Sequence, residues 1–195
     1  YFREDFFSTD LKLLKADSVA VDQHLDFNTN VLKDGVNYTL LTDKRGAYSV
    51  VAFDTQSRES RVVSGHFKVK NWSVDYPKVD RDRLVFCSTE GKRGRGQDHV
   101  GIIDLLTGEG RMVDIEFKGL RPHDVTLLES TVIDGVIQVM VKVKENIYLV
   151  RLDMAGKELE RQCLTENIAE QILSASVSKA GDNLFVTGTY AKREK

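Results

Sequence analysis

One pattern of residues occurs four times along this chain, at intervals close to fifty residues. Each copy contains a short run that favours a β-strand, and the four runs begin 47, 53 and 47 residues apart. The four runs are Val36–Thr42, Arg83–Thr89, Val136–Lys142 and Asn183–Thr189. In the first three copies a second strand-like run follows and ends near an aspartate, namely Asp54, Asp104 and Asp153. Self-similarity at such a period is typical of proteins built from stacked structural repeats.

Each copy can be divided into four short strands separated by turns. In the second copy we expect strands at Trp72–Val79, Arg83–Thr89, Val100–Leu105 and Gly110–Ile115. Four short strands in a period near fifty residues are typical of one blade of a β-propeller. The sequence therefore predicts an all-β, β-propeller-like fold with four-stranded antiparallel blades and a repeat of about 49 residues.

Turn-forming residues separate the first and second strands of each copy. The segments are 33–35, 80–82, 134–135 and 181–183, and each contains Asp together with Gly, Arg or Asn. Asp, Asn and Gly suit these turns because they tolerate the left-handed backbone conformation. Pro77 falls within the expected first strand of the second copy, where proline cannot donate to a ladder, so it either weakens the boundary of that strand or marks a bulge.

Blades of a propeller pack face to face, so the second and third strands must present large apolar side chains to both neighbours. We expect Trp72 to pack at a blade junction and not to bind a ligand. The residues expected to be mostly buried are Leu40, Val51, Phe53, Leu84, Phe86, Ile102, Val139, Val141, Leu149, Leu152 and Phe185.

We expect residues 1–195 to form a single partial propeller of about three and a half blades, with residues 1–23 as an irregular or closing segment. The fourth copy stops at residues 190–195, where the loop after its second strand should begin. An open blade leaves unpaired strand edges. Either the N-terminal segment supplies the missing outer strands of a four-bladed ring, or the chain is about half of a larger propeller. We favour the second interpretation.

The third strand and its turn carry a resemblance to a known class of proteins. Asp104 ends the third strand of the second copy, and the turn Leu105-Leu-Thr-Gly-Glu109 follows it. In this respect residues 24 to 195 resemble β-propeller repeat proteins, particularly bacterial ones. The tryptophan-aspartate dipeptide of one large propeller family is absent from the third strands, so the resemblance names no specific family. It implies a scaffold, a lectin-like binder, a peptidase lid domain or, occasionally, an enzyme.

Composition excludes some classes of function. The formal net charge of −2 argues against a generally basic nucleic-acid-binding protein, so we expect no nucleic-acid partner. No apolar run approaches the roughly 20 residues of a membrane-spanning helix.

The cellular compartment is not determined by the sequence. The chain begins with Tyr1, and a secreted or periplasmic location is favoured if the N-terminus is processed. Cys87 and Cys163 fall on strands of different rank, so we expect two free, buried thiols.

Blade topology places the loops between second and third strands on the same face as the connections between blades. These segments contain more basic than acidic residues, so we expect a face that attracts anionic partners. The basic residues are Lys44, Arg45, Lys68, Lys70, Lys92, Arg93, Arg95, Lys118, Arg121, Lys144, Lys192, Arg193 and Lys195. The alternative interpretation is that exposed loops carry charge for solubility alone.

Within this face, Gly91-Lys-Arg-Gly-Arg-Gly96 superficially resembles a phosphate-binding loop. A phosphate-binding loop joins a strand to a helix and ends in Gly-Lys-Ser or Gly-Lys-Thr, whereas this segment should join two antiparallel strands. Its arginines can still bind carboxylate, sulfate or phosphate groups. The candidate cationic ligand-binding residues are Lys44, Arg45, Lys92, Arg93, Arg95 and Arg121.

Three histidines, His66, His99 and His123, map to the same face and complete the candidate ligand-binding set. They come from three loops without the close spacing of a metal motif, so we expect neither a metal nor a cofactor. No nucleophile elbow, zinc-protease helix or paired-cysteine motif occurs, so catalysis by this chain alone is not expected.

Two hypotheses of function follow. The first is a non-catalytic binding or scaffold module that uses its loops to hold an anionic protein, peptide or glycan. The second is the accessory propeller of an enzyme, such as a hydrolase or peptidase, whose catalytic residues lie outside this chain. In the second case the remaining part of its own propeller is a further partner.

Overall fold

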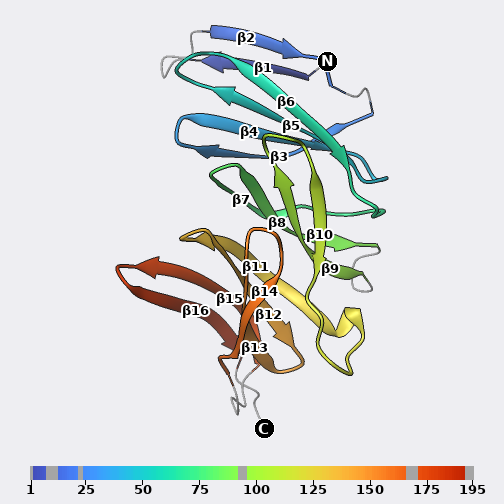
Figure 1. The fold of residues 1–195 in the computed structure, drawn as a ribbon, viewed down its shortest axis with the longest axis vertical. Coiled ribbons are helices and arrows are strands. Elements are labelled where there is room, and N and C mark those ends of the chain that lie inside the picture. Colours follow the sequence, from blue (N-terminus) through green and yellow to red (C-terminus); the bar gives the residue numbers. More distant parts are fainter. Residues whose placement is uncertain (1, 8–12, 22–23, 92–95, 166–170, 192–195) are drawn as a thin grey trace.

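The structure is a computed structural model that describes residues 2–7, 13–21, 24–91, 96–165 and 171–191. Within these ranges the chain forms sixteen β-strands and one short 3₁₀ helix, η1 (Pro122–Asp124). The strands make three four-stranded sheets and two two-stranded sheets, stacked face to face along the molecule (Figure 1). The sheets do not close into a ring, so the chain is an all-β, partial propeller as the sequence predicts.

The three four-stranded sheets are complete blades in which every strand pairs antiparallel with the next along the chain. The first blade comprises β3 (Asp26–Lys33), β4 (Val36–Thr42), β5 (Ala47–Asp54) and β6 (Ser60–His66). The second comprises β7 (Asp75–Asp80), β8 (Arg83–Glu90), β9 (Gln97–Asp104) and β10 (Gly110–Asp114). The third comprises β11 (Val125–Ile133), β12 (Val136–Val143), β13 (Asn146–Leu152) and β14 (Glu158–Cys163).

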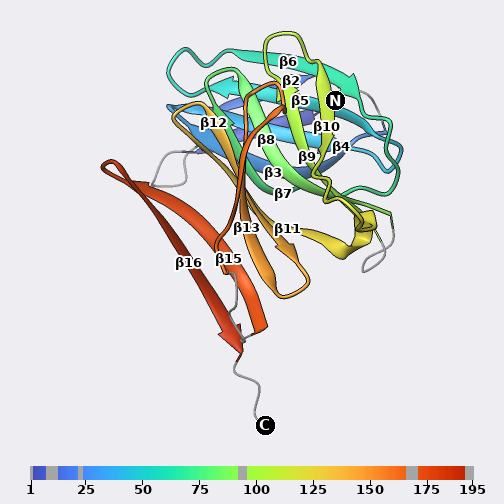
Figure 2. The same cartoon turned by 60° about the horizontal axis from the view of Figure 1, so that its bottom comes forward.

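A separate hairpin lies at each end of the stack. The N-terminal hairpin pairs β1 (Phe2–Phe7) with β2 (Leu13–Val19), and the C-terminal hairpin pairs β15 (Gln171–Ala180) with β16 (Asn183–Ala191). The two hairpins belong to different sheets and lie at opposite ends of the molecule (Figure 1). Figure 2 shows the β15–β16 hairpin projecting past the third blade. The described residues therefore do not close the ring through pairing of the two hairpins.

The turn chemistry expected between first and second strands is confirmed. Asp34 and Gly35 have φ values of 50° and 79°, and Asp134 and Gly135 have 53° and 74°. Two consecutive residues in this conformation make the tight turn that best matches the twist of a hairpin. The turns fix the register of the strands on either side.

Of the two alternatives for Pro77, the structure shows the bulge. The pairing of β7 with β8 shifts register between Asp75 and Lys78, and Tyr76 has a φ of 54°. Trp72 lies outside β7 and forms an isolated bridge with Glu90, so this first strand begins later than the sequence suggested. At this shift the residues around Pro77 leave the regular ladder of β7 with β8. Proline has no N–H to donate to a ladder, so it is accommodated at such an irregularity.

Apolar side chains between adjacent blades form the core. Phe86 and Ile103 of the second blade pack with Leu40 and Val50 of the first, while Val85 packs toward the third blade. Of the eleven residues expected to be buried, ten are at most 6% exposed, so the assigned blade register is confirmed for the complete blades.

The aromatic junction between the first and second blades also forms as expected. The Trp72 ring lies 5.3 Å from the Phe67 ring and 6.1 Å from the Phe86 ring, measured between centroids. Its indole Nε1 donates a hydrogen bond of 2.7 Å to the carbonyl of Asp43. Trp72 therefore fills a blade junction and satisfies its polar atom there.

Two predictions about burial are wrong. Phe185 of β16 is 50% exposed, because no described strand pairs along the outer edge of β16 and no further blade covers it. Cys87 is a free, buried thiol as expected, but the free thiol of Cys163 is only partly buried because β14 is the outer strand of its blade.

The aspartates that end the third strands have a shared structural role. The Asp104 carboxylate accepts hydrogen bonds from the backbone N–H groups of Leu106 and Thr107, at 2.8 and 3.0 Å. Asp54 makes the same two contacts, with Gln56 and Ser57, and Asp153, directly after β13, accepts hydrogen bonds from the N–H groups of Ala155 and Lys157. The repeated aspartate is therefore explained by the turn it closes, since Asp side chains readily satisfy such backbone donors.

Candidate functional site

The turns after second strands and the connections between blades form one continuous surface, here called the loop face. It comprises residues 43–46 between β4 and β5, 67–74 between the first two blades, Glu90, Gly91 and residues 96–99 around the β8–β9 turn, and residues 114–124 from the end of β10 through η1. Backbone hydrogen bonds join these segments: Asn71 N–H donates to the Lys44 carbonyl at 2.8 Å, and Gly91 N–H donates to the Asn71 carbonyl at 3.0 Å. The loop face is thus a fixed part of the fold.

The candidate basic residues fall into two groups. Lys44 and Arg45 are exposed on the β4–β5 turn, and the Arg121 side chain is 74% exposed just before η1. Lys92, Arg93 and Arg95 lie outside the described residues, although Glu90 and Gly96 on either side of them belong to the loop face. The structure therefore positions three of the six candidates directly.

Most carboxylates on the loop face accept hydrogen bonds from other groups of the protein. Asp43 accepts hydrogen bonds of 2.8 Å from the N–H groups of Arg45 and Ala47. Asp98 accepts one of 2.8 Å from the Thr89 hydroxyl and one of 2.8 Å from the Leu127 N–H, which ties the second blade to the third. These contacts satisfy the carboxylates without a ligand.

Two further carboxylates are held in the same way. Glu90 accepts a hydrogen bond of 3.0 Å from the Lys70 N–H. The Asp124 carboxylate accepts bonds of 3.2 Å from both the backbone N–H and the side-chain Nε of Arg121. Hydrogen bonding from Arg121 holds the pKa of Asp124 below its ordinary value. Asp124 is therefore ionised at neutral pH and neutralises part of the Arg121 charge.

Five basic side chains on the loop face form no ion pair or side-chain hydrogen bond with any described residue. They are Lys44, Arg45, Lys68, Lys70 and Lys118, and all are exposed. The described loop face carries equal numbers of basic and acidic residues: Lys44, Arg45, Lys68, Lys70, Lys118 and Arg121 against Asp43, Glu90, Asp98, Asp114, Glu116 and Asp124. Most of these carboxylates are bonded within the protein, whereas the five cations are exposed, so the cations are the more accessible charges for an external partner. Exposed Lys and Arg side chains bind carboxylate, sulfate and phosphate groups through charge-assisted hydrogen bonds.

The three candidate histidines are not brought together in one site. His66 and His99 line one hollow of about 510 Å³, and His123 lines another of about 640 Å³ beside Asp98. His99 is buried, with Nδ1 2.6 Å from Asp114 Oδ1 and Nε2 3.6 Å from Glu90 Oε2. The described residues contain no group of three or more His, Cys, Asp or Glu side chains placed to hold a metal ion.

The carboxylate partners of His99, Asp114 and Glu90, were not predicted from the sequence. Asp114 ends β10 and Glu90 ends β8, and both strands pair with β9, which carries His99. The register of β9 with β10 accounts for the Asp114 contact, because Asp114 lies directly opposite His99, whereas Glu90 lies opposite Gln97 and reaches His99 from two residues away. These side-chain contacts connect β8, β9 and β10 at the loop face, in addition to the backbone pairing of the three strands.

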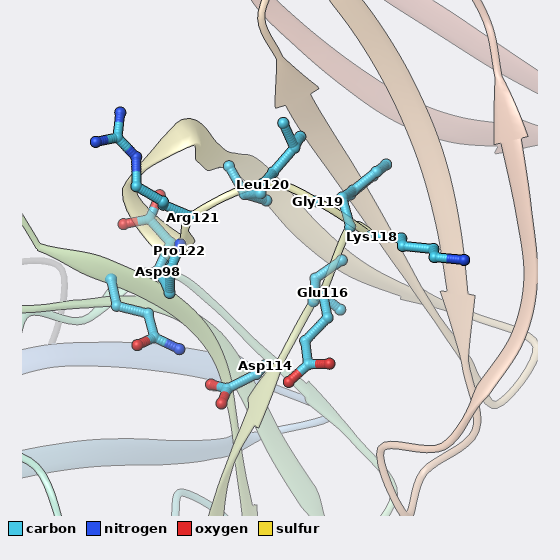
Figure 3. Close-up of a pocket in the computed structure, with 12 residues that line it drawn as sticks. Asp98, Asp114, Glu116, Lys118, Gly119, Leu120, Arg121 and Pro122 are labelled. Carbon is cyan, nitrogen blue, oxygen red and sulfur yellow. The ribbon is translucent and has the colours of Figure 1, made fainter.

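A third hollow, of about 540 Å³, lies beneath the connection that follows β10. In Figure 3 the Asp114 and Glu116 carboxylates lie near each other, whereas the head groups of Lys118 and Arg121 point outward in different directions. The hollow is therefore lined by carboxylates and rimmed by cations, and the cations are the groups that a partner would meet first.

Cys87 lies within β8, away from the loop face, and burial raises the pKa of its thiol to about 12, so its reactive thiolate does not form at neutral pH. Within the described parts of the chain no helix is long and apolar enough to span a membrane.

Comparison with known proteins supports the fold. No protein-family model and no curated protein matches the sequence. A structure from a mechanistic analysis of two prolyl endopeptidases is similar over 85% of this chain and 25% of its own length, with a TM-score of 0.50 and 11% identity. The β-propeller domain of Nup133 from Vanderwaltozyma polyspora is similar over 83% and 51%, with a TM-score of 0.38 and 8% identity. The chain thus spans a quarter of the first structure and half of the second.

Proposed function

We propose that this chain is a non-catalytic binding module whose loop face holds an anionic protein, peptide or glycan. The observation that carries the proposal is a difference in bonding: most acidic side chains on that face are bonded within the protein, whereas several basic side chains are not. Asp43, Asp98 and Asp124 are hydrogen-bonded within the protein, whereas Lys44, Lys68 and others are exposed and unpaired with described residues. Such a surface attracts anions, and salt weakens that attraction.

The anchoring residues fall into two parts. Lys44, Arg45, Lys68 and Lys70 surround the junction of the first and second blades, and Arg121 lies at the junction of the second and third. From their sequence position, Lys92, Arg93 and Arg95 complete this set. His66, His99 and His123 remain candidates through their neighbouring hollows, with His99 acting through its structural contacts because it is buried.

A binding assay with defined polyanions tests the proposal. Heparin and a poly-glutamate peptide serve as probes, and calorimetry at low and high salt measures their affinity. Lys68→Glu combined with Lys70→Glu should weaken binding by at least roughly tenfold at low salt, and charge reversal at Lys92, Arg93 and Arg95 should abolish it. Lys157→Glu, on an exposed turn at the opposite face, is the matched control and should change affinity little.

Two results would contradict the proposal. One is unchanged affinity in the loop-face variants at low salt. The other is an equal loss of affinity in Lys157→Glu, which would show that only the net charge of the chain matters.

A second candidate function is the accessory propeller of an enzyme, such as a hydrolase or peptidase. The likeness to a prolyl endopeptidase structure, of which the matching part is 25%, favours this candidate at the level of the fold. Its partners would then include the remaining part of its own propeller and a catalytic unit. The gene sequence beyond the codon for Lys195 separates the candidates: a hydrolase-like stretch favours the accessory role, whereas further blades and a stop codon remove it.

A further inference from the structure

A buried histidine beside a hollow of the loop face has a ring nitrogen without a hydrogen-bond partner. The His99 side chain is 7% exposed, and its Nδ1 lies 2.6 Å from Asp114 Oδ1. An ionised carboxylate only accepts hydrogen bonds, so Nδ1 carries the proton of the neutral imidazole and Nε2 is an acceptor. Nε2 is buried and forms no hydrogen bond with any described residue. Buried polar atoms without a partner are rare in proteins and call for an explanation.

The neighbour of Nε2 on the adjacent strand is also an acceptor. Glu90 Oε2 lies 3.6 Å from His99 Nε2, which is beyond hydrogen-bond range. The other carboxylate oxygen of Glu90, Oε1, accepts a hydrogen bond from the Lys70 N–H. Two acceptors therefore lie side by side, and no described residue donates to either of them. A group that carries several N–H donors would satisfy both.

The hollow beside these acceptors, here called the His99 hollow, has the size of a ligand site. Its volume is about 510 Å³, and its walls come from β8, β9, β10 and the connection that follows β6. Glu90 and Asp114 contribute carboxylates, and Phe67, Val69 and Met112 contribute apolar surface. A cavity of this order, in which a few polar groups converge beside apolar surface, is typical of ligand-binding sites.

The hollow of about 540 Å³ beneath the connection after β10 adjoins the His99 hollow, because Gln97 and Asp114 line both. It adds the carboxylate of Glu116, which lies near that of Asp114 (Figure 3). The Glu116 side chain forms no hydrogen bond or ion pair with a described residue. Negative charges that lie near each other repel, and a bound cation relieves the repulsion.

The cations around the two hollows are directed elsewhere. Arg111 Nη1 donates to a carbonyl of the third blade, and Arg121 Nε donates to Asp124. The head groups of Lys118 and Arg121 point outward (Figure 3). Lys68 lines the His99 hollow but forms no ion pair with a described residue. Among the described residues, no lysine or arginine therefore neutralises the carboxylates that line the two hollows.

We infer that the His99 hollow binds a guanidinium group, the head group of an arginine side chain. A guanidinium is a planar cation with five N–H donors, and it matches a carboxylate bidentately. It donates to Glu90 Oε2 and, after a turn of the Glu90 side chain, to His99 Nε2. Glu90 is 35% exposed and accepts one hydrogen bond, through Oε1, so this turn breaks at most that bond.

The surroundings favour the same group. Asp114 and Glu116 add negative charge from the adjoining hollow, and the apolar wall of the His99 hollow suits the alkyl stem that carries a guanidinium. The inference does not rest on the proposed binding of anions, because that proposal concerns the exposed lysines and arginines of the loop face.

Nuclear magnetic resonance of the His99 ring nitrogens in the full chain tests the inference. A capped Gly-Arg-Gly peptide and free ethylguanidine both carry the guanidinium, whereas a capped Gly-citrulline-Gly peptide has the same shape without the charge. The two guanidinium probes should shift the His99 Nε2 signal saturably, and the citrulline peptide should not. Tighter binding of the arginine peptide would identify a peptide as the source of the group, and equal or tighter binding of ethylguanidine a small molecule.

Matched variants locate the site. Glu90→Gln removes one negative charge and should weaken binding of the arginine peptide roughly tenfold, and Glu116→Gln should weaken it several-fold. Glu109→Gln is the control, because Glu109 is exposed at the opposite end of the β9–β10 pair, and it should leave the affinity unchanged.

Four results would overturn the inference. They are the absence of a saturable shift, equal binding of the citrulline peptide, and unchanged affinity in a variant that combines Glu90→Gln with Glu116→Gln. The fourth is binding that begins only when Lys92, Arg93 and Arg95 are replaced by alanine, because cations of the chain itself would then occupy the hollow.

Discussion

Two strands of the same rank hold nearly the same apolar residues in different environments. In β8 the residues Leu84-Val85-Phe86 follow a two-residue turn, and in β16 the residues Leu184-Phe185-Val186 follow an equivalent turn. The first three are 2%, 0% and 0% exposed, and the second three are 42%, 50% and 45% exposed. Local sequence therefore makes both segments strands, and the neighbouring strands decide whether their side chains are buried.

The difference comes from what surrounds each strand. β8 pairs with β7 on one edge and β9 on the other, and blades pack on both faces of its sheet. β16 pairs only with β15 among the described strands. The burial of a strand in this fold thus depends on the neighbouring blades, which lie one repeat, about fifty residues, away in the sequence. Substitutions at matched positions of the two strands should reveal this dependence.

The largest expected effect is at Phe86. Phe86→Ala should lower the free energy of unfolding by roughly 3–5 kcal/mol, because it leaves a cavity among buried aromatic rings. Phe185→Ala should lower it by less than about 1 kcal/mol, because half of that side chain already contacts solvent. Urea denaturation of the two variants measures the contrast. Equal losses would mean that β16 is buried.

A smaller effect is expected where Gly101 faces Phe86. A Cβ atom at position 101 would lie 2.2 Å from the Phe86 ring, so Gly101→Ala should cost roughly 1–3 kcal/mol through overpacking. Phe86→Leu removes the far end of the ring, so the double variant should lose less stability than the two single losses predict. Simple additivity in this double-mutant cycle would show that the two residues do not touch.

The next effect concerns the contact between the first and second blades. The Tyr48 hydroxyl donates a hydrogen bond of 2.7 Å to the Gly108 carbonyl, so Tyr48→Phe should cost about 0.5–1.5 kcal/mol at neutral pH. Burial raises the pKa of Tyr48 from 10.0 to about 12. The stability linked to its protonated form is complete below pH 10 and is lost as pH rises toward 12. Tyr48→Phe should lack this alkaline loss, and denaturation at pH 9 to 12 tests it; a parallel decline in both proteins would contradict it.

The smallest effect is expected at Asp104. The Thr107 N–H lowers the pKa of Asp104 below its ordinary value of 3.8. The associated stability is present above the unfolded value and is lost as pH falls through the folded value. Asp104→Asn should therefore cost less than about 1 kcal/mol at neutral pH and show a shallower loss of stability in acid. Acid denaturation followed by circular dichroism measures both, and an unchanged acid profile would contradict the assigned turn contact.

Much of the fold could be predicted from the sequence because the same strand and turn signals recur in each repeat. The spacing of the four strand-like runs, the Asp-Gly turns and the aspartates after third strands each recur, and each has a local physical cause. Phe185 could not be predicted correctly, because its burial depends on strands that the described chain does not place beside it. Likewise, strand boundaries such as the start of β7 depend on a bulge, whose extent Pro77 alone does not fix.

The candidate site could be predicted only in part. Blade topology correctly places Lys44 and Arg121 on segments of the loop face. It does not reveal that Asp98 and Asp43 are satisfied by backbone N–H groups, since those bonds come from the exact path of the connections. Nor does it show that His99 is buried between carboxylates from two neighbouring strands. The nature of the ligand remains a proposal because charge alone specifies a class of partner.

Residue-resolved amide hydrogen exchange tests the central contrast between β8 and β16 most directly. The Val85 amide lies in a strand that is paired on both edges and buried on both faces, so it should exchange slowly, at the rate of global unfolding. The Val186 amide lies in a strand paired only with β15 among the described strands, so it should exchange much faster. Equally slow exchange at the two positions, or fast exchange at Val85, would contradict the account.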